Sequence, residues 1–145
     1  MVNAAVDAGI TVVVAAGNKG PESRTIYGPA AAAGAITVGS MGDVGKGGFY
    51  LSTFSSRGPT ADGRTKPDIV APGRLITAAK AGSADSYTTL TGTSMAAPFV
   101  AGVVALMLNS NPSLTPALAK EDLARTAVDW GAPGPDNEYG AGRLD

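Results

Sequence analysis

The sequence predicts an α/β fold in which a mostly parallel sheet packs against helices. Residues Ile10–Ala16 form a continuous run rich in β-branched side chains, which is typical of a strand buried on both faces of a parallel sheet. Residues Ser94–Leu108 form an almost wholly apolar stretch, and a helix that is apolar all round is expected to be buried on all sides. The chain also holds 20 glycines and 10 prolines, which mostly end apolar runs and indicate tight turns.

The composition excludes several classes of protein. Eleven Lys and Arg against 12 Asp and Glu give a net charge of −1, so we expect neither a nucleic acid nor an anionic membrane as a partner. The chain has no cysteine and no histidine, which removes disulfides, thiolate metal sites and the usual general base. We also expect no apolar run of the roughly 18 residues that span a membrane, and no signal peptide after Met1.

The N-terminal half predicts a helix followed by short strands. Residues 2–8 are expected to end a helix, with Gly9 as the C-cap. Three short apolar runs predict strands bounded by glycine or proline, and they comprise residues 10–16, 35–39 and 66–72. Residues 40–49 are rich in glycine and are expected to form a surface connection.

The C-terminal half predicts a hairpin and two helices. Residues 76–79 and 87–90 are expected to pair as a hairpin. The apolar helix follows, with Thr93 or Ser94 able to cap it. A second helix is expected from Ser113 or Thr115 to about residue 127, and the residues from 131 onward are rich in turns. No repeat or linker divides the chain, so we expect residues 1–145 to form one unit.

Two polar residues lie where an α/β fold places its chemistry. Ser94 opens the apolar helix, where the positive end of the helix dipole favours developing negative charge. Its alternative interpretation is a helix cap. Asn18 directly follows the strand 10–16, and ligands in such folds bind beyond the carboxyl ends of strands. Its side-chain amide can donate to an oxyanion, although a turn asparagine after Gly17 is the commoner role.

Five motifs together resemble the subtilisin-like serine proteases. They follow one another in the order that this family shows and cover nearly the whole chain. They are Ala15-Ala-Gly-Asn18, Phe54-Ser-Ser-Arg-Gly-Pro59, Lys66-Pro-Asp-Ile-Val-Ala-Pro-Gly73, Gly92-Thr-Ser-Met-Ala-Ala-Pro-Phe-Val-Ala-Gly102 and Tyr139-Gly-Ala-Gly-Arg-Leu-Asp145. The resemblance implies the C-terminal portion of a three-layer α/β fold, with a mostly parallel sheet and a buried helix that carries the nucleophile.

The resemblance also implies roles for individual residues. Ser94 matches the nucleophile, while Asn18 and the Ser94 main-chain amide match the two donors of the oxyanion hole. Peptide or ester substrates are implied, and the residues implied to contact them are Ala15, Ala16 and Gly17 in a wall of the specificity pocket, Tyr27 near the pocket base, and Thr93 on the leaving-group side. No metal ligand is implied; calcium occurs in full-length family members, but no motif here supports a calcium site.

The chain departs from the family pattern in its catalytic triad. The triad occurs in the chain order Asp, His, Ser, and its first two members lie upstream of the asparagine motif, whereas this sequence has no histidine. We therefore expect residues 1–145 to be part of a catalytic domain, and peptide-bond hydrolysis to need an Asp- and His-bearing part. Most members act outside the cell, so the resemblance implies a secreted parent protein.

Two further functions stay open. The first is a weak serine esterase, since activated esters need little acid catalysis; the candidate bases are Lys66, Asp68, Lys80 and Asp85. The second is a non-catalytic fragment that dimerises or pairs with the remaining half. An unpaired edge of the strand 10–16 and an uncovered helix face would favour such association.

Overall fold

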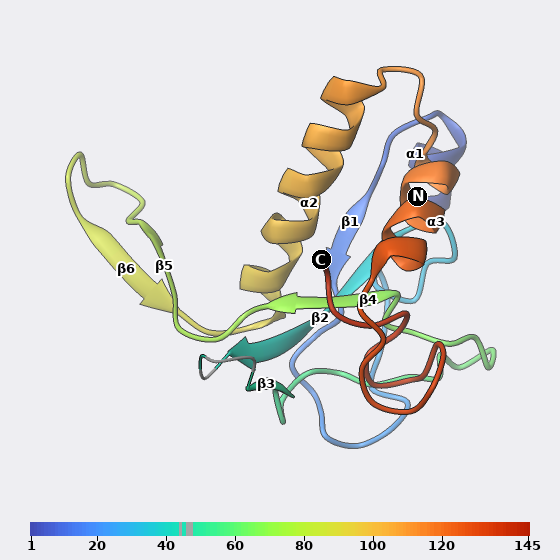
Figure 1. The fold of residues 1–145 in the computed structure, drawn as a ribbon, viewed down its shortest axis with the longest axis horizontal. Coiled ribbons are helices and arrows are strands. Elements are labelled where there is room, and N and C mark those ends of the chain that lie inside the picture. The colour runs from blue at the N-terminus through green and yellow to red at the C-terminus, as the bar shows by residue number, and fades with distance from the viewer. Residues whose placement is uncertain (44, 46–47) are drawn as a thin grey trace.

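The computed structural model describes residues 1–43, 45 and 48–145. Its elements, in chain order, are α1 (Val2–Asp7), β1 (Val13–Ala15), β2 (Ile36–Asp43), β3 (Phe49–Leu51), β4 (Ile69–Pro72), β5 (Ile76–Ala79), β6 (Tyr87–Leu90), α2 (Thr93–Ser110) and α3 (Pro116–Thr126). Strands β1 to β4 form one sheet, and β5 and β6 form a separate hairpin that projects from it (Figure 1). The predicted hairpin and both predicted C-terminal helices are confirmed.

The sheet is mostly parallel, as predicted. Strand β2 pairs in parallel with β1, where Val13 lies opposite Ile36, and with β4, where Val38 lies opposite Ile69. Only its last residues pair antiparallel, with β3. Strand β1 ends the path of paired strands in the described part of the chain, so its outer edge is unpaired there.

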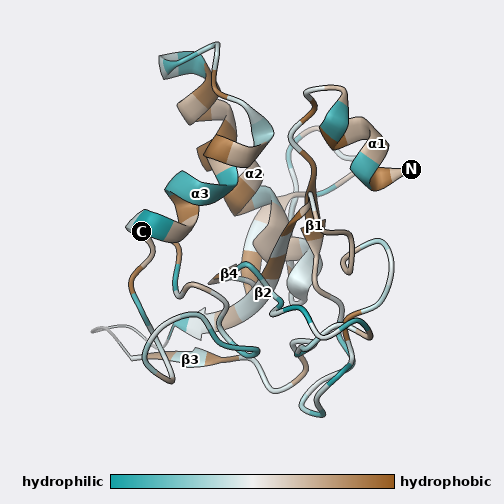
Figure 2. Cartoon of the chain, turned by 90° about the vertical axis from the view of Figure 1, so that its right-hand side faces the viewer, coloured by the Kyte–Doolittle hydropathy of each residue, from teal (hydrophilic) through white to brown (hydrophobic). Residues whose placement is uncertain are grey.

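The main core lies between the sheet and helices α2 and α3. Alternate residues of β2 and β4 enter it, and it also contains Val100 and Val104 of α2 and Leu123 of α3. Figure 2 shows α2 and α3 on one side of β1 and the short helix α1 on the other. The period-2 alternation of the strands therefore separates two packing layers, as a three-layer fold requires.

Helix α2 is buried along one stripe only. Thr93, Ala96, Val100 and Val104 are its buried residues, at the spacing of one helix face, whereas Leu106 on another face is 70% exposed. The expectation of burial on all sides is therefore wrong for this chain, because its sheet and α3 cover only one side. We expected Thr93 or Ser94 to cap this helix. In the structure Gly92 is the N-cap, and it makes no side-chain capping hydrogen bond.

The length and hydropathy of α2 correct the expectation that no apolar stretch of the chain is long enough to span a membrane. The helix has 18 residues and a mean hydropathy of 1.5, enough by length and composition to cross a membrane. Its buried residues nevertheless pack against β1, β2 and β4. These contacts are those of a helix that covers a sheet.

Strand β2 is longer than predicted and takes up the start of the expected connection at 40–49. Ser40 is buried and its hydroxyl bonds that of Ser52 at 2.9 Å. A Cβ on Gly42 would lie 2.5 Å from the ring of Tyr50, so the glycine lets the aromatic ring of β3 cross the strand. Gly42, which we expected in a surface connection, therefore serves close strand packing. Residues 44, 46 and 47 of the expected connection lie outside the described residues.

A buried lysine ties the first strands to α3. Lys66 is 2% exposed, and its Nζ donates to Ala35 O at 2.9 Å, Thr37 Oγ1 at 2.8 Å and Asp68 Oδ2 at 2.5 Å. The other carboxylate oxygen of Asp68 pairs with Lys120 Nζ at 2.9 Å. Burying a charge is costly unless it is paired and hydrogen-bonded, and here all three donor positions of the ammonium are used.

Lys66 gives the stability of the chain a pH dependence. Burial lowers the pKa of Lys66 from 10.5 to about 8, and Asp68 opposes this shift. Between these two values the unfolded chain binds a proton that the folded chain has released, so the free energy of unfolding rises with pH. From about pH 7 to about pH 10 we expect the wild type to gain up to about 3 kcal/mol relative to Lys66→Met. Urea unfolding followed by Trp130 fluorescence measures the gain, and a pH-independent difference between the two proteins would contradict it.

Candidate active site

The candidate site lies where the carboxyl end of β1 meets the start of α2. The chain leaves β1 at Ala15 and turns at Gly17, whose φ is +107°. A Cβ on Gly17 would lie 2.9 Å from Ser56 Oγ, so this turn needs glycine both for its backbone conformation and for space. Asn18 follows at once, beyond the end of a parallel strand, where α/β folds bind their ligands.

Asn18 is bonded to the first residue of α2. Its Oδ1 accepts hydrogen bonds from Thr93 N and Thr93 Oγ1, both at 3.0 Å, and Thr93 Oγ1 accepts one from Gly17 N at 3.2 Å. Because a main-chain N–H can only donate, the atom that faces it is the amide oxygen, and Nδ2 is turned away. Asn18 thus caps a helix 75 residues away in the sequence and keeps its own donor free.

Ser94 is the second residue of α2 and is exposed. Main-chain amides of the first helical turn have no partner within the helix and carry the positive end of the dipole. Ser94 also lines a cavity of about 410 Å³ between the start of α2 and the β5–β6 hairpin. The structure thus brings Asn18 and Ser94 to the same end of α2, joined through Thr93.

A second cavity lies beside Asn18, since its chain neighbours Gly17 and Lys19 both line it. It measures about 190 Å³, and its lining includes Ala15, Ala16, Gly17 and Tyr27, the residues that the sequence assigned to a substrate pocket. Ala16 is 2% exposed and lies deep, whereas Tyr27 is 64% exposed and lies at the rim rather than near the base. Thr93, the remaining residue of that set, is 1% exposed, so its side chain holds Asn18 in position.

Lys19 and Ser56 are among the residues at this cavity that the sequence analysis missed. Ser56 Oγ accepts from Lys19 N at 3.1 Å, and Ser56 N donates to Gly17 O at 2.9 Å. Lys19 lines the cavity beside Asn18. Its adjacency to the asparagine was the available signal for Lys19, while the role of Ser56 depends on a tertiary contact that the sequence does not reveal.

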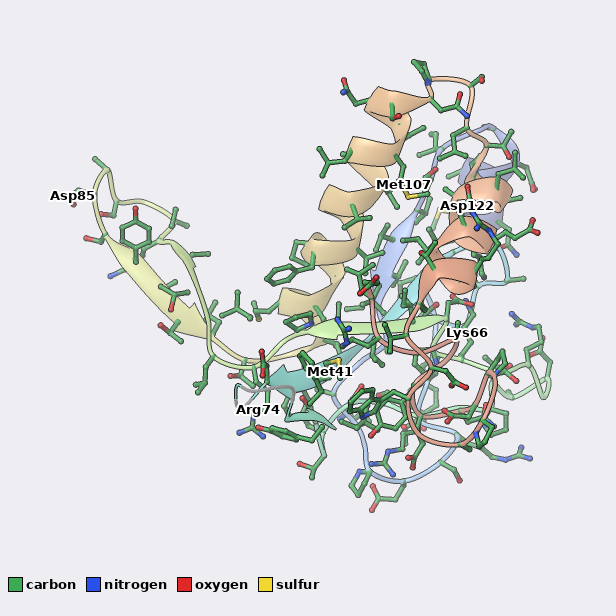
Figure 3. The ribbon with its side chains drawn as sticks, viewed as in Figure 1. Met41, Lys66, Arg74, Asp85, Met107 and Asp122 are labelled. Atoms are coloured by element: carbon green, nitrogen blue, oxygen red, sulfur yellow. The ribbon has the colours of Figure 1, made fainter. Side chains whose placement is uncertain are left out.

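The four candidate surrogate bases are bound elsewhere or lie on the exposed hairpin. Lys66 and Asp68 form the buried ion pair described above, and Figure 3 labels Lys66. Figure 3 shows Asp85 at the tip of the hairpin, away from the sheet. Lys80 lies on the same exposed turn. Among the residues that the structure describes, no group of three or more acidic side chains could hold a metal ion.

Comparison with known proteins assigns the family. The model of the subtilase family, peptidase family S8, matches residues 1–142. The chain belongs to this family of subtilisin-like serine proteases.

Individual relatives agree with this assignment in sequence and in structure. The chain is 43% identical to serine protease AprX of Bacillus subtilis, over 95% of its own length and 34% of AprX. It is 37% identical to the subtilisin-like protease SBT6.1 of Arabidopsis thaliana, over 94% of its length and 14% of that protein. The solved structure of Sphericase superposes with a TM-score of 0.88 at 32% identity, over 99% of this chain and 50% of Sphericase. The chain therefore spans about a third of AprX and half of the matched Sphericase chain.

Proposed function

We propose that residues 1–145 form part of the catalytic domain of a serine endopeptidase and supply its nucleophile and oxyanion hole. Ser94 is the nucleophile, and Asn18 Nδ2 and the Ser94 main-chain amide are the two donors. The observation that carries the proposal is the pair of hydrogen bonds from Thr93 to Asn18 Oδ1, which leaves Nδ2 free beside the start of α2. Membership of the subtilase family supports the assignment.

The proposed reaction is acyl transfer through Ser94. Its Oγ forms a bond to the carbonyl carbon of the substrate while a base accepts the hydroxyl proton, and the carbonyl oxygen becomes an oxyanion held by the two donors. The C–N bond then breaks, and the same proton passes to the leaving amine. Since the chain has no histidine, we propose that the base comes from polypeptide outside these 145 residues.

Ser94→Ala tests this proposal. We expect purified wild-type chain to hydrolyse p-nitrophenyl acetate faster than Ser94→Ala, because the ester needs little acid catalysis and the oxyanion hole remains. A chromogenic peptide is expected to be cleaved only when a base is supplied. Equal ester hydrolysis by the two proteins, together with failure of a fluorophosphonate to label Ser94, would overturn the role of Ser94.

A partner that covers α2 is the second part of the proposal. Phe99 and Leu106 of α2 are 42% and 70% exposed, and β1 has an unpaired edge in the described part of the chain. Both features favour association. We propose that the rest of the catalytic domain covers this face, and that a second copy of the chain takes its place when the chain is alone.

The name of one relative bears on where the whole protein acts. One of them, 41% identical over 78% of this chain, is named an extracellular serine proteinase of a Thermus species. That name supports an extracellular location for the whole protein.

A further inference from the structure

The turn that carries Asn18 is built on a glycine. Gly17 has a φ of +107°, and a residue without a side chain restricts its own backbone little. A group that acts in catalysis must nevertheless stay within about 0.5 Å of its productive position. Bonds from other segments therefore have to hold this turn in place.

Ser56 bonds to the main chain on both sides of Asn18. Its N–H donates to Gly17 O at 2.9 Å, and its Oγ accepts from Lys19 N at 3.1 Å. A Cβ on Gly17 would lie 2.9 Å from Ser56 Oγ, so the contact is close as well as hydrogen-bonded. One residue thus brackets Asn18, while Thr93 holds the side-chain oxygen of the asparagine.

The segment that contains Ser56 is itself fixed to the sheet. Ser56 is fully buried, and the hydroxyl of its neighbour Ser55 accepts from Ser40 N of β2 at 3.0 Å. Phe54 O accepts from Gly20 N at 2.9 Å, which extends the contact beyond the turn. Residues 54–56 therefore connect the Asn18 turn to the central strand of the sheet.

We propose that Ser56 is a positioning residue of the oxyanion hole, which acts through the main chain of Gly17 and Lys19 to keep Asn18 Nδ2 directed at the reacting carbonyl oxygen. The alternative is that Ser56 only stabilises the loop, in which case its hydroxyl would affect unfolding and not the Asn18 donor. The inference rests on the proposed function, because that function makes Nδ2 a donor to the oxyanion.

Ser56→Ala removes the acceptor of Lys19 N and keeps the main-chain bond to Gly17 O. We expect kcat for Ser94-dependent hydrolysis of p-nitrophenyl acetate to fall about tenfold with little change in KM, because a misplaced donor weakens binding of the transition state. In Asn18→Asp, which lacks the donor, the same substitution should lower the rate by no more than about twofold, since residues that act as a unit are not additive.

Ser52→Ala is the matched control. Ser52 is also fully buried, and its hydroxyl bonds that of Ser40 at 2.9 Å. Its loss should lower the unfolding midpoint, because a buried hydroxyl loses its partner, but should leave kcat unchanged. An equal fall of kcat in Ser52→Ala and Ser56→Ala would overturn the proposal, and so would additive effects of Ser56→Ala and Asn18→Asp.

Nuclear magnetic resonance tests the positioning without requiring catalysis. In the ¹⁵N-labelled chain, the side-chain NH₂ signals of Asn18 are identified by their loss in Asn18→Asp. We expect Ser56→Ala to shift these signals and Ser52→Ala to leave them in place. Unmoved signals in Ser56→Ala would overturn the proposal. Shifted signals in a chain whose wild type shows no Ser94-dependent hydrolysis would uphold the positioning of Asn18 and count against the proposed function alone.

Discussion

Replacing Asp68 with alanine is expected to lower the free energy of unfolding by about 3 kcal/mol at neutral pH. The substitution removes the carboxylate that pairs with buried Lys66 at 2.5 Å and with Lys120 at 2.9 Å. It also removes the acceptor for Thr37 N, which lies 2.7 Å from Asp68 Oδ2. A buried charge without its partner and a buried donor without an acceptor are both costly.

The low pKa of Lys66 limits this cost and makes it depend on pH. Burial already holds the pKa of Lys66 at about 8, and loss of Asp68 removes a group that raises it. In Asp68→Ala the lysine therefore releases its proton at a lower pH, and the deficit against wild type should be smaller at alkaline pH. Urea unfolding at two pH values measures both quantities.

A double variant and a surface control make the test specific. Adding Lys66→Met to Asp68→Ala should recover most of the lost stability, since no unpaired charge stays buried. Asp122→Ala breaks an exposed pair with Arg125 and should leave the unfolding midpoint almost unchanged. A double variant as unstable as Asp68→Ala would show that the network does not stabilise the chain through this charge pair.

Sequence patterns predicted the helices and strands that local interactions determine. The apolar helix appears where it was expected, and Thr115 caps α3 by accepting from Leu118 N. The expected strand over residues 10–16, buried on both faces, is corrected: it extends only over Val13–Ala15 and is partly buried, because its outer edge has no neighbouring strand in the described part of the chain. The extent of β2 could not be predicted, because Gly42 packs against Tyr50 of another strand and Gly39 against Val70. Nor could the exposed face of α2, because exposure depends on which neighbouring elements the chain contains.

The candidate site likewise contains residues that the sequence identified and contacts that only the tertiary structure shows. Ser94 and Asn18 stood out from their positions at a helix start and after a strand. The sequence could not show that Asn18 caps the helix of Ser94 or that Thr93 joins the two, since these bonds connect residues 75 positions apart. Lys66 and Asp68 were candidate bases, and the structure pairs them with each other in a buried network. Loss of stability and loss of activity should therefore map to different residues.

Asn18→Asp is expected to lower the rate of Ser94-dependent hydrolysis by about 10²–10³, the loss known for removal of the corresponding oxyanion donor in this family. Aspartate keeps an oxygen acceptor for Thr93 N and Thr93 Oγ1, so the cap of α2 remains. It replaces the Nδ2 donor with a carboxylate oxygen, which repels an oxyanion. The loss should fall on kcat with little change in KM, because the lost interaction is made in the transition state.

The matched control is Asn109→Asp, the same chemical change near the exposed C-terminal end of the same helix. It should leave the rate unchanged and lower the thermal midpoint only slightly, because a negative charge near the C-terminal end of a helix is mildly unfavourable. If Asn18→Asp lowers the thermal midpoint as much as Thr93→Val does, the asparagine contributes mainly as a cap. If the rate falls while the thermal midpoint stays unchanged, the Nδ2 donor acts on the reacting oxygen. The reason is that Oδ1 caps the helix and Nδ2 is the donor, and the substitution removes only the donor.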